Sequence, residues 1–214
     1  MNIAIVIPAR LESTRLKHKM LMMFDGIPLI RLVFDKCRTM GYDCFVVTDS
    51  KKIAQHISRE SVIMSDEAEN GTARIRSVLK KLEGYDTIIN IQGDMLDISY
   101  QTVKPFIDRA KHDFSVYTGY TKGCEPSDVK VIHQEGKAMW FTRAPMGYGD
   151  RHLGLYAYKR HILQSYDLFT DEYPEENLEQ KRILGHYDIN VVKTEYNGIE
   201  INTKEDINSR TMLN

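Results

Sequence analysis

Short apolar runs alternate with amphipathic segments along most of this chain, and this alternation restricts its possible folds more than any other feature. The run IAIVI at 3–7 ends at Pro8 and is typical of a strand buried on both faces. The next segment, 28–40, predicts a helix with proline in its first turn and Gly41 beyond its end. Further strands are predicted at 44–47 and 87–91, and helices at 50–59, 72–82 and 99–110. This order predicts βαβ units around a mostly parallel sheet.

The second half of the chain is richer in predicted strands. They lie at 114–120, 129–133, 138–141, 153–158 and 189–192, with helices at 161–169, 175–183 and 203–210. The sequence has no internal repeat, no low-complexity segment and no linker rich in Pro, Gly and Ser. We therefore expect a single domain over residues 1–214, with a three-layer α/β fold and a smaller strand-rich subregion at about 110–160.

Composition excludes several classes of protein. The 29 basic and 30 acidic residues give a formal net charge of -1, whereas a general nucleic-acid surface needs an excess of Lys and Arg. No segment approaches the ~20 apolar residues of a membrane span, and the run at 3–7 lacks the features of a signal peptide. The three cysteines form no CxxC pair, which favours reduced thiols. We expect a cytoplasmic protein that binds neither nucleic acid nor membranes.

A basic segment directly follows the first predicted strand. In open α/β sheets, ligands bind beyond the carboxyl ends of the strands. Arginine and lysine there can hold a phosphorylated ligand, and four are present: Arg10, Arg15, Lys17 and Lys19. The alternative is a solvated basic loop. The segment lacks the GxxxxGK[ST] pattern of a Walker P-loop.

Two further clusters lie beside predicted strands or helices. Asp94 follows the strand at 87–91 and could hold Mg²⁺, which prefers oxygen ligands, although Gly-Asp is also common in ordinary turns. Gly71 precedes a predicted helix and could expose backbone N–H groups to a ligand. A simple turn with Thr72 as the helix cap explains that cluster equally well.

Taken together and in order, these clusters resemble the CMP-KDO synthetases, the 3-deoxy-manno-octulosonate cytidylyltransferases. That family has PAR-x-x-STRL-x-x-K, matched at 8–19, and ATD, GTER and NVQGD, which resemble VTD at 47–49, GTAR at 71–74 and NIQGD at 90–94. Later motifs N-x-VKVV, FSRA, HLGIYGY and LEQLR resemble DVKV at 128–131, FTRA at 141–144, HLGLYAY at 152–158 and LEQKR at 178–182. The resemblance covers nearly the whole chain.

The resemblance implies a role for each matching residue. Those implied to bind the nucleotide are Pro8, Ala9, Arg10, Ser13, Arg15, Lys19, Gly71, Thr72 and Asp94, of which Arg10, Lys19 and Asp94 would act on the reacting phosphates. Those implied to line the sugar-acid pocket are Gln92, Arg143, His152, Tyr156, Glu179 and Gln180. Taken alone, His152 could be structural and Tyr156 could be a core residue. The implied metal is Mg²⁺, held by Asp94 and Asn202.

This chain departs from the family pattern at several positions. Met95 and Leu96 replace Glu-Pro after the QGD motif, and Asn202 replaces the aspartate of DTPEDL. An amide oxygen can bind Mg²⁺ but carries no charge, and Asn202 could equally cap a helix. The family's TRADHQS segment appears as MSDEAEN at 64–70 without its arginine, and the stretch between Phe141 and His152 is shorter.

We therefore expect an enzyme that uses CTP and Mg²⁺ to activate a 2-keto sugar acid, with pyrophosphate as the second product. The strand-rich subregion at about 110–160 would complete the sugar pocket and a homodimer contact. Three alternatives stay open: another sugar acid as substrate, a sugar 1-phosphate as substrate, or a CTP-binding protein with impaired turnover. Met95 and Asn202 are the residues that favour impaired turnover.

Overall fold

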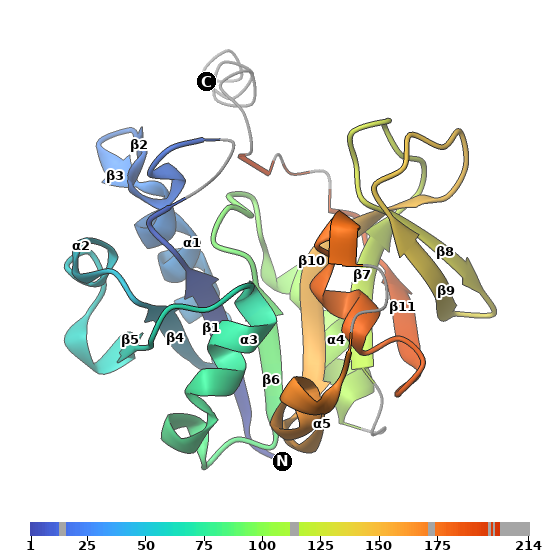
Figure 1. Ribbon diagram of the computed structural model, residues 1–214. Helices are drawn as coiled ribbons and strands as arrows, with labels where there is room; N and C mark the ends of the chain where they lie inside the picture. Colours follow the sequence, from blue (N-terminus) through green and yellow to red (C-terminus); the bar gives the residue numbers. More distant parts are fainter. Residues whose placement is uncertain (13–15, 112–115, 171–173, 197, 199, 202–214) are drawn as a thin grey trace.

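A mixed nine-stranded sheet runs through the structure, a computed structural model that describes residues 1–12, 16–111, 116–170, 174–196, 198, 200 and 201 (Figure 1). Its strand order is β5 (Val62–Met64), β4 (Asp43–Thr48), β1 (Ile3–Ala9), β6 (Thr87–Ile91), β10 (Asp150–Lys159), β7 (Val116–Thr121), β11 (Ile189–Lys193), β9 (Lys137–Thr142) and β8 (Lys130–Gln134). The first four are parallel, whereas β10 runs antiparallel to both of its neighbours. The α/β class is confirmed, and the second half of the chain makes the sheet mixed.

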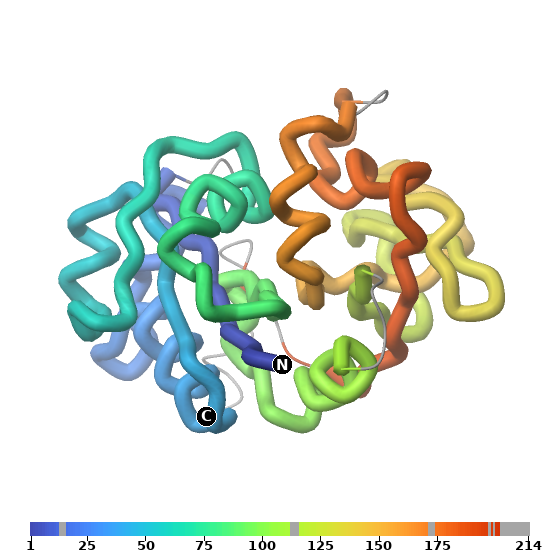
Figure 2. Tube along the Cα trace, turned by 90° about the horizontal axis from the view of Figure 1, so that it is seen from below, coloured from blue at the N-terminus to red at the C-terminus, as the bar shows by residue number. Residues whose placement is uncertain are grey.

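Helices cover both faces of this sheet and create three layers (Figures 1 and 2). Helices α1 (Leu29–Arg38), α2 (Lys51–Ala54) and α4 (Tyr100–Ala110) pack on one face, and α3 (Gly71–Ser77) and α5 (Arg160–Ser165) on the other. Strand β1 is buried along its whole length because successive side chains alternate between the two layers. Ile5 and Ile7 join the first core, and Ala4 and Val6 the second.

Local signals set several of the helix ends. The Ser50 hydroxyl accepts a hydrogen bond from the backbone N–H of Ile53 and caps α2, which confirms the predicted cap. Helix α3 is capped by Asn70, whose side chain accepts from Ala73, so the proposed cap at Thr72 is wrong. Short elements complete the fold: β2 (Met23–Phe24), β3 (Ile27–Pro28) and the 3-10 turns η1 (Lys19–Leu21), η2 (Arg59–Ser61) and η3 (Leu79–Leu82).

Some predicted helices are shorter or absent. The helix expected at 50–59 ends at Ala54, and that at 161–169 is α5 followed by the 3-10 turn η4 (Tyr166–Leu168). The helix at 175–183 is wrong, because two 3-10 turns, η5 (Pro174–Glu176) and η6 (Glu179–Arg182), replace it. Asn177 lies between them with a left-handed backbone (φ 48°), which a continuous helix cannot contain. The helix predicted at 203–210 lies outside the described residues.

The direction of β10 determines which residues face one another across the sheet. Because β10 is antiparallel to β6, Leu155 pairs with Ile91 at the carboxyl end of β6. The first half of β10 therefore continues past that end, into the space where ligands bind in open α/β sheets. In the part of the chain that the structure describes, no helix is long and apolar enough to cross a membrane.

Candidate active site

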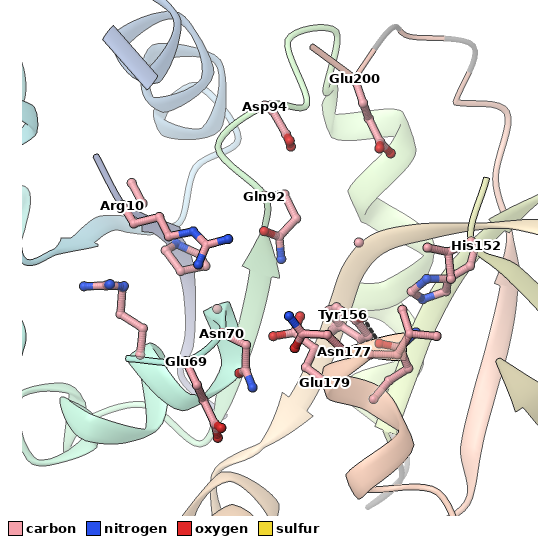
Figure 3. Close-up of a pocket in the computed structure, with 18 of the residues that line it drawn as sticks. Arg10, Glu69, Asn70, Gln92, Asp94, His152, Tyr156, Asn177, Glu179 and Glu200 are labelled. Atoms are coloured by element: carbon pink, nitrogen blue, oxygen red, sulfur yellow. Dashed lines mark hydrogen bonds between the residues drawn. The ribbon is translucent and has the colours of Figure 1, made fainter. Parts of the chain in front are cut away.

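A pocket of about 340 Å³ opens at the carboxyl ends of β1 and β6 (Figure 3). One wall comes from the loops after these strands and from the start of α3. The opposite wall comes from β10, the loop after β9 and the segment around η6. Its volume is within the usual range for a small-molecule site.

Most residues implied by the family resemblance line this one pocket. They are Pro8, Ala9, Arg10, Lys19, Gly71, Gln92, Asp94, Arg143, His152, Tyr156, Glu179 and Gln180. Thr72 is buried behind the pocket wall, and Lys17 is exposed and outside the lining. The positions of Ser13, Arg15 and Asn202 lie outside the described residues.

The wall formed by β1 and β6 carries positive charge beside a carboxylate. Arg10 follows β1 and is exposed to the pocket. The Lys19 ammonium, nearly buried, donates to the carboxylate of Asp94 at 2.5 Å. The backbone at Gly93 allows this approach, since a Cβ there would stand 2.8 Å from the sulfur of Met20. The pairing holds a cation and a carboxylate together at the end of a buried strand.

Glu200 is a pocket residue that the sequence reasoning missed. Its segment pairs with Met95 in an antiparallel bridge, next to Asp94. Burial, and secondly the charge of Asp94, raise the pKa of Glu200 to about 7. It forms an ion pair with Arg151, whose guanidinium lies 3.5 Å from Glu200 and 3.5 Å from Asp128. The available signal was its position two residues before Asn202, in a motif already matched to the family.

Arg74 is a second residue for which the sequence gave no role. It lines the pocket although its side chain is only 4% exposed. The guanidinium donates to Asp49 and to Ser65, each at 2.7 Å. Arg74 thereby ties the loop after β4 and the segment before α3 to the helix itself.

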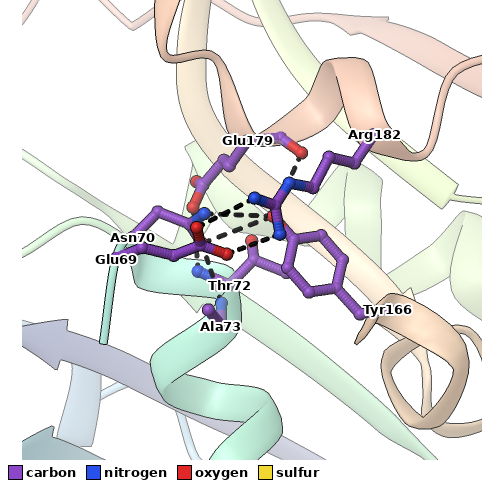
Figure 4. A network of polar contacts seen from close by, with 7 residues as sticks. All are labelled: Glu69, Asn70, Thr72, Ala73, Tyr166, Glu179 and Arg182. Carbon is purple, nitrogen blue, oxygen red and sulfur yellow. Dashed lines mark hydrogen bonds and ion pairs between the residues drawn. The ribbon is translucent and has the colours of Figure 1, made fainter. Parts of the chain in front are cut away.

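Glu179 connects the two walls at the start of α3 (Figure 4). Its carboxylate accepts the backbone N–H of Thr72 at 2.8 Å, where the first turn of a helix leaves N–H groups unpaired. Burial raises the pKa of Glu179, and the hydrogen bonds from Thr72 partly oppose that rise. Nearby, Arg182 forms a two-pronged ion pair with Glu69 at 2.5 and 2.8 Å. These contacts fix η6 against α3.

His152 is held in the neutral state on the opposite wall. Burial, and secondly the charge of Arg143, lower the pKa of His152 to about 3. Its Nε2 lies 2.8 Å from the hydroxyl of Thr118, and that hydroxyl donates to the carbonyl of Leu155 at 3.0 Å. One hydroxyl has one hydrogen, so if Thr118 donates it to Leu155, Nε2 carries the imidazole proton and donates to Thr118. Nδ1 is then left as a hydrogen-bond acceptor.

Two more polar side chains are oriented on this wall. The Tyr156 hydroxyl donates to Oε1 of Gln180 at 3.1 Å, and Nε2 of Gln180 is buried without a partner among the described residues. Arg143 is anchored by two hydrogen bonds to Glu176. Its backbone N–H donates to the Glu176 carboxylate at 2.8 Å, and its Nε–H donates to the Glu176 backbone carbonyl at 3.0 Å.

The segments carrying Gln180 and Arg143 also contact each other directly. Lys181, next to Gln180, pairs with Glu176 at 3.0 Å. Its ammonium lies 4.7 Å from the ring centre of Trp140, on β9. The cation–π contact thus joins η6 to β9, and the ion pair joins η6 to Glu176, the residue that holds Arg143.

Glycine allows close approach both between the two walls and within the first wall. A Cβ at Gly154 would stand 2.7 Å from Cγ of Gln92, and one at Gly71 would stand 3.1 Å from Pro8. Gln92 can therefore lie against β10 only because residue 154 has no side chain.

In this three-layer α/β fold, the cations Arg10 and Lys19 follow β1 and lie in the same pocket as Asp94, the carboxylate in the turn after β6. This arrangement defines a nucleotide-binding α/β enzyme of the nucleotidyltransferase class. The chain belongs to the cytidylyltransferase family, whose model matches residues 4–191.

Individual relatives agree with this assignment. The 3-deoxy-manno-octulosonate cytidylyltransferase of Chlorobium chlorochromatii is 35% identical, with 97% of this chain and 94% of the relative covered. The enzyme of the same name from Fusobacterium nucleatum is 32% identical, with 94% and 92% covered. A solved structure of CMP:2-keto-3-deoxy-manno-octonic acid synthetase in complex with CTP superposes with a TM-score of 0.89 at 30% identity, covering 100% of this chain and 98% of that one.

Proposed function

We propose that this chain transfers CMP from CTP to 3-deoxy-manno-octulosonate, or to a closely related 2-keto sugar acid, and releases pyrophosphate. The observation that carries the proposal is one pocket with two chemically different walls. Arg10, Lys19 and Asp94 form the first, and His152 and Gln180 belong to the second. The names of the similar proteins support the same pair of substrates.

The first wall suits a triphosphate. Arg10 and Lys19 supply cationic donors at the end of β1, and charge-assisted hydrogen bonds to phosphate oxygens are the stronger kind. The Lys19 ammonium has three N–H groups, so it can donate to Asp94 and to phosphate together. These contacts would hold the α-phosphate in line with the incoming hydroxyl.

The second wall suits a sugar acid. Nδ1 of His152 can accept a hydrogen bond from a hydroxyl, and Nε2 of Gln180 can donate one. Arg143 is positioned by Glu176 to face the substrate carboxylate. Donors, acceptors and a cation on one rigid wall would orient the anomeric hydroxyl, and orientation is the main contribution that this chain makes to the reaction.

The residues present fit Mg²⁺, the metal that the family resemblance implies. Asp94 lies in the turn after β6 and lines the pocket, and a buried carboxylate oxygen of Glu200 lacks a hydrogen-bond donor among the described residues. Mg²⁺ commonly binds through one or two carboxylates together with substrate phosphates. We propose Asp94 as a ligand, and Asn202 stays a predicted one. Bound Mg²⁺ would neutralise charge on the phosphate oxygens during transfer.

A pyrophosphate-release assay tests the proposal. CTP, ATP, GTP and UTP are each combined with a panel of sugar acids and a panel of sugar 1-phosphates. We expect release to be fastest with CTP and 3-deoxy-manno-octulosonate, and to stop in a chelator. Equal turnover with UTP, or a requirement for a sugar 1-phosphate, would contradict the proposal. CTP binding without pyrophosphate release would identify a protein that has lost turnover.

We extend the proposal to a cytoplasmic homodimer. What supports the compartment is that Cys37, Cys44 and Cys124 are all free thiols, as expected of a protein in a reducing environment. The dimer rests on the family resemblance alone. Light scattering of the purified protein would measure the mass, and a monomer at working concentrations would contradict it.

A further inference from the structure

We propose that Glu200 provides a second carboxylate for the metal site, opposite Asp94. This inference rests on the proposed function, because it assigns a further ligand to the magnesium-bound nucleotide of that reaction. Glu200 would take the role that the resemblance gives to position 202, where this chain has an uncharged asparagine.

The backbone brings the segments that carry the two carboxylates together. Glu200 pairs with Met95, the residue after Asp94, in an antiparallel bridge. The N–H of Ile201 donates to the carbonyl of Asp94 at 3.3 Å. Both side chains project into the same end of the pocket (Figure 3). The hydrogen bond from Ile201 is part of the bridge, which holds the Glu200 segment directly against the turn that carries Asp94.

The Glu200 carboxylate has an ion-pair partner in Arg151, but one of its oxygens accepts no hydrogen bond from the described residues. Its Oε1 is buried and has no hydrogen-bond donor among the described residues, and the Arg151 guanidinium stays 3.5 Å away. Lys19 lies instead against Asp94, at 2.5 Å. Like charges with unfilled lone pairs are costly inside a protein, and a bound cation offsets that cost.

A second orphaned group lies beside the pair. Tyr196 is 3% exposed, and its buried hydroxyl has no hydrogen-bond partner among the described residues. The charges of Glu200, Asp97 and Asp94 act on this hydroxyl, in that order. Mg²⁺ keeps several of its waters when it binds, and such waters could pair with a polar group at this position.

The competing interpretation is that Glu200 is only structural and holds Arg151 in place. The two interpretations differ in what happens to CTP binding without metal. If Glu200 is a ligand, removing its charge spares or strengthens binding of metal-free CTP, because one negative group near the triphosphate disappears. If Glu200 is structural, the same change weakens CTP binding with and without metal.

Calorimetric titration of CTP, with excess Mg²⁺ and separately with a chelator, tests this in the absence of turnover. Wild type, Glu200→Gln and a matched control, Glu195→Gln, are compared; Glu195 is an exposed glutamate on the same segment, outside the pocket lining. We expect the gain in CTP affinity on adding Mg²⁺ to be at least about tenfold smaller in Glu200→Gln than in wild type, since even residues that only contact a metal's ligands contribute this much to metal affinity. The control should keep the full gain.

Each other outcome is decisive. A full Mg²⁺-dependent gain in Glu200→Gln overturns the inference, as does loss of metal-free CTP binding in that variant. Wild type that binds CTP with no gain from Mg²⁺ also overturns it. Wild type that binds no CTP contradicts the proposed function itself.

Discussion

His152 should make the protein less stable in mild acid. The side chain is buried on the second wall of the pocket and hydrogen-bonded through Nε2 to Thr118. In the folded protein its pKa is about 3, lowered by burial and then by the charge of Arg143. In the unfolded chain it returns to about 6.5. The informative change is His152→Gln, which has an amide that can still donate to Thr118 but does not titrate.

The sign and size follow from the difference between these two pKa values. Between about pH 6.5 and 3 the unfolded chain binds a proton that the folded protein does not, so acid favours unfolding. Each pH unit below 6.5 lowers the free energy of unfolding by about 1.4 kcal/mol through this one group. At about pH 5 the loss from His152 is therefore roughly 2 kcal/mol, and above about pH 7 it is absent.

Urea unfolding of wild type and His152→Gln at about pH 7.5 and pH 5 measures how much unfolding free energy His152 removes at the lower pH. Other groups titrate in both proteins, so the quantity to compare is the loss between the two pH values. We expect wild type to lose roughly 2 kcal/mol more than the variant. Equal losses would show that His152 takes up a proton while folded, and the argument for a neutral hydrogen-bond acceptor would fail.

Two further predictions concern the two walls of the pocket. Lys19→Ala should weaken CTP binding by about 10- to 150-fold, because a charge-assisted hydrogen bond contributes roughly 1.5–3 kcal/mol. Substitution of its exposed neighbour, Lys17→Ala, should leave CTP binding unchanged. Equal calorimetric affinities for the two variants would mean that the basic segment is a solvated loop. Gly154→Ala places a Cβ 2.7 Å from Gln92 and should raise KM for the sugar acid but not for CTP, while Gly84→Ala, which meets nothing within 4 Å, should change neither KM. A parallel rise of both constants in Gly154→Ala would mean that the walls do not divide the substrates as proposed.

The parts of the fold that a single segment determines could be predicted from the sequence. Strand β6 occupies the predicted residues 87–91, and β1 covers the predicted residues 3–7 and continues to Ala9. Both were predictable because strands buried on both faces are continuous apolar runs. Arg10 and Asp94 were found for the same reason, since both directly follow such a run. Their joint presence in one pocket follows from the rule for strand ends.

Features that depend on distant partners could not be predicted. The direction of β10 depends on pairing with β6 and β7, which no local pattern encodes. The helix expected at 175–183 is interrupted at Asn177, a residue that tolerates left-handed backbone better than most but does not require it. Apart from its position two residues before Asn202, Glu200 gave no signal in the sequence, since a charged residue in an extended segment is ordinarily solvated. Its surroundings are created by Met95 and Asp94, far away in the chain.

Trp140 gives the second wall an optical property. It is the single tryptophan of the chain, partly exposed on β9, with the Lys181 ammonium 4.7 Å from its ring centre. Lys181 adjoins Gln180, and Trp140 lies three residues before Arg143. Indole emission responds to nearby charge and water, so any shift between β9 and η6 changes its intensity or colour. A sugar acid that moves η6 against β9 as it binds would therefore be detected by fluorescence, without a label and without waiting for product.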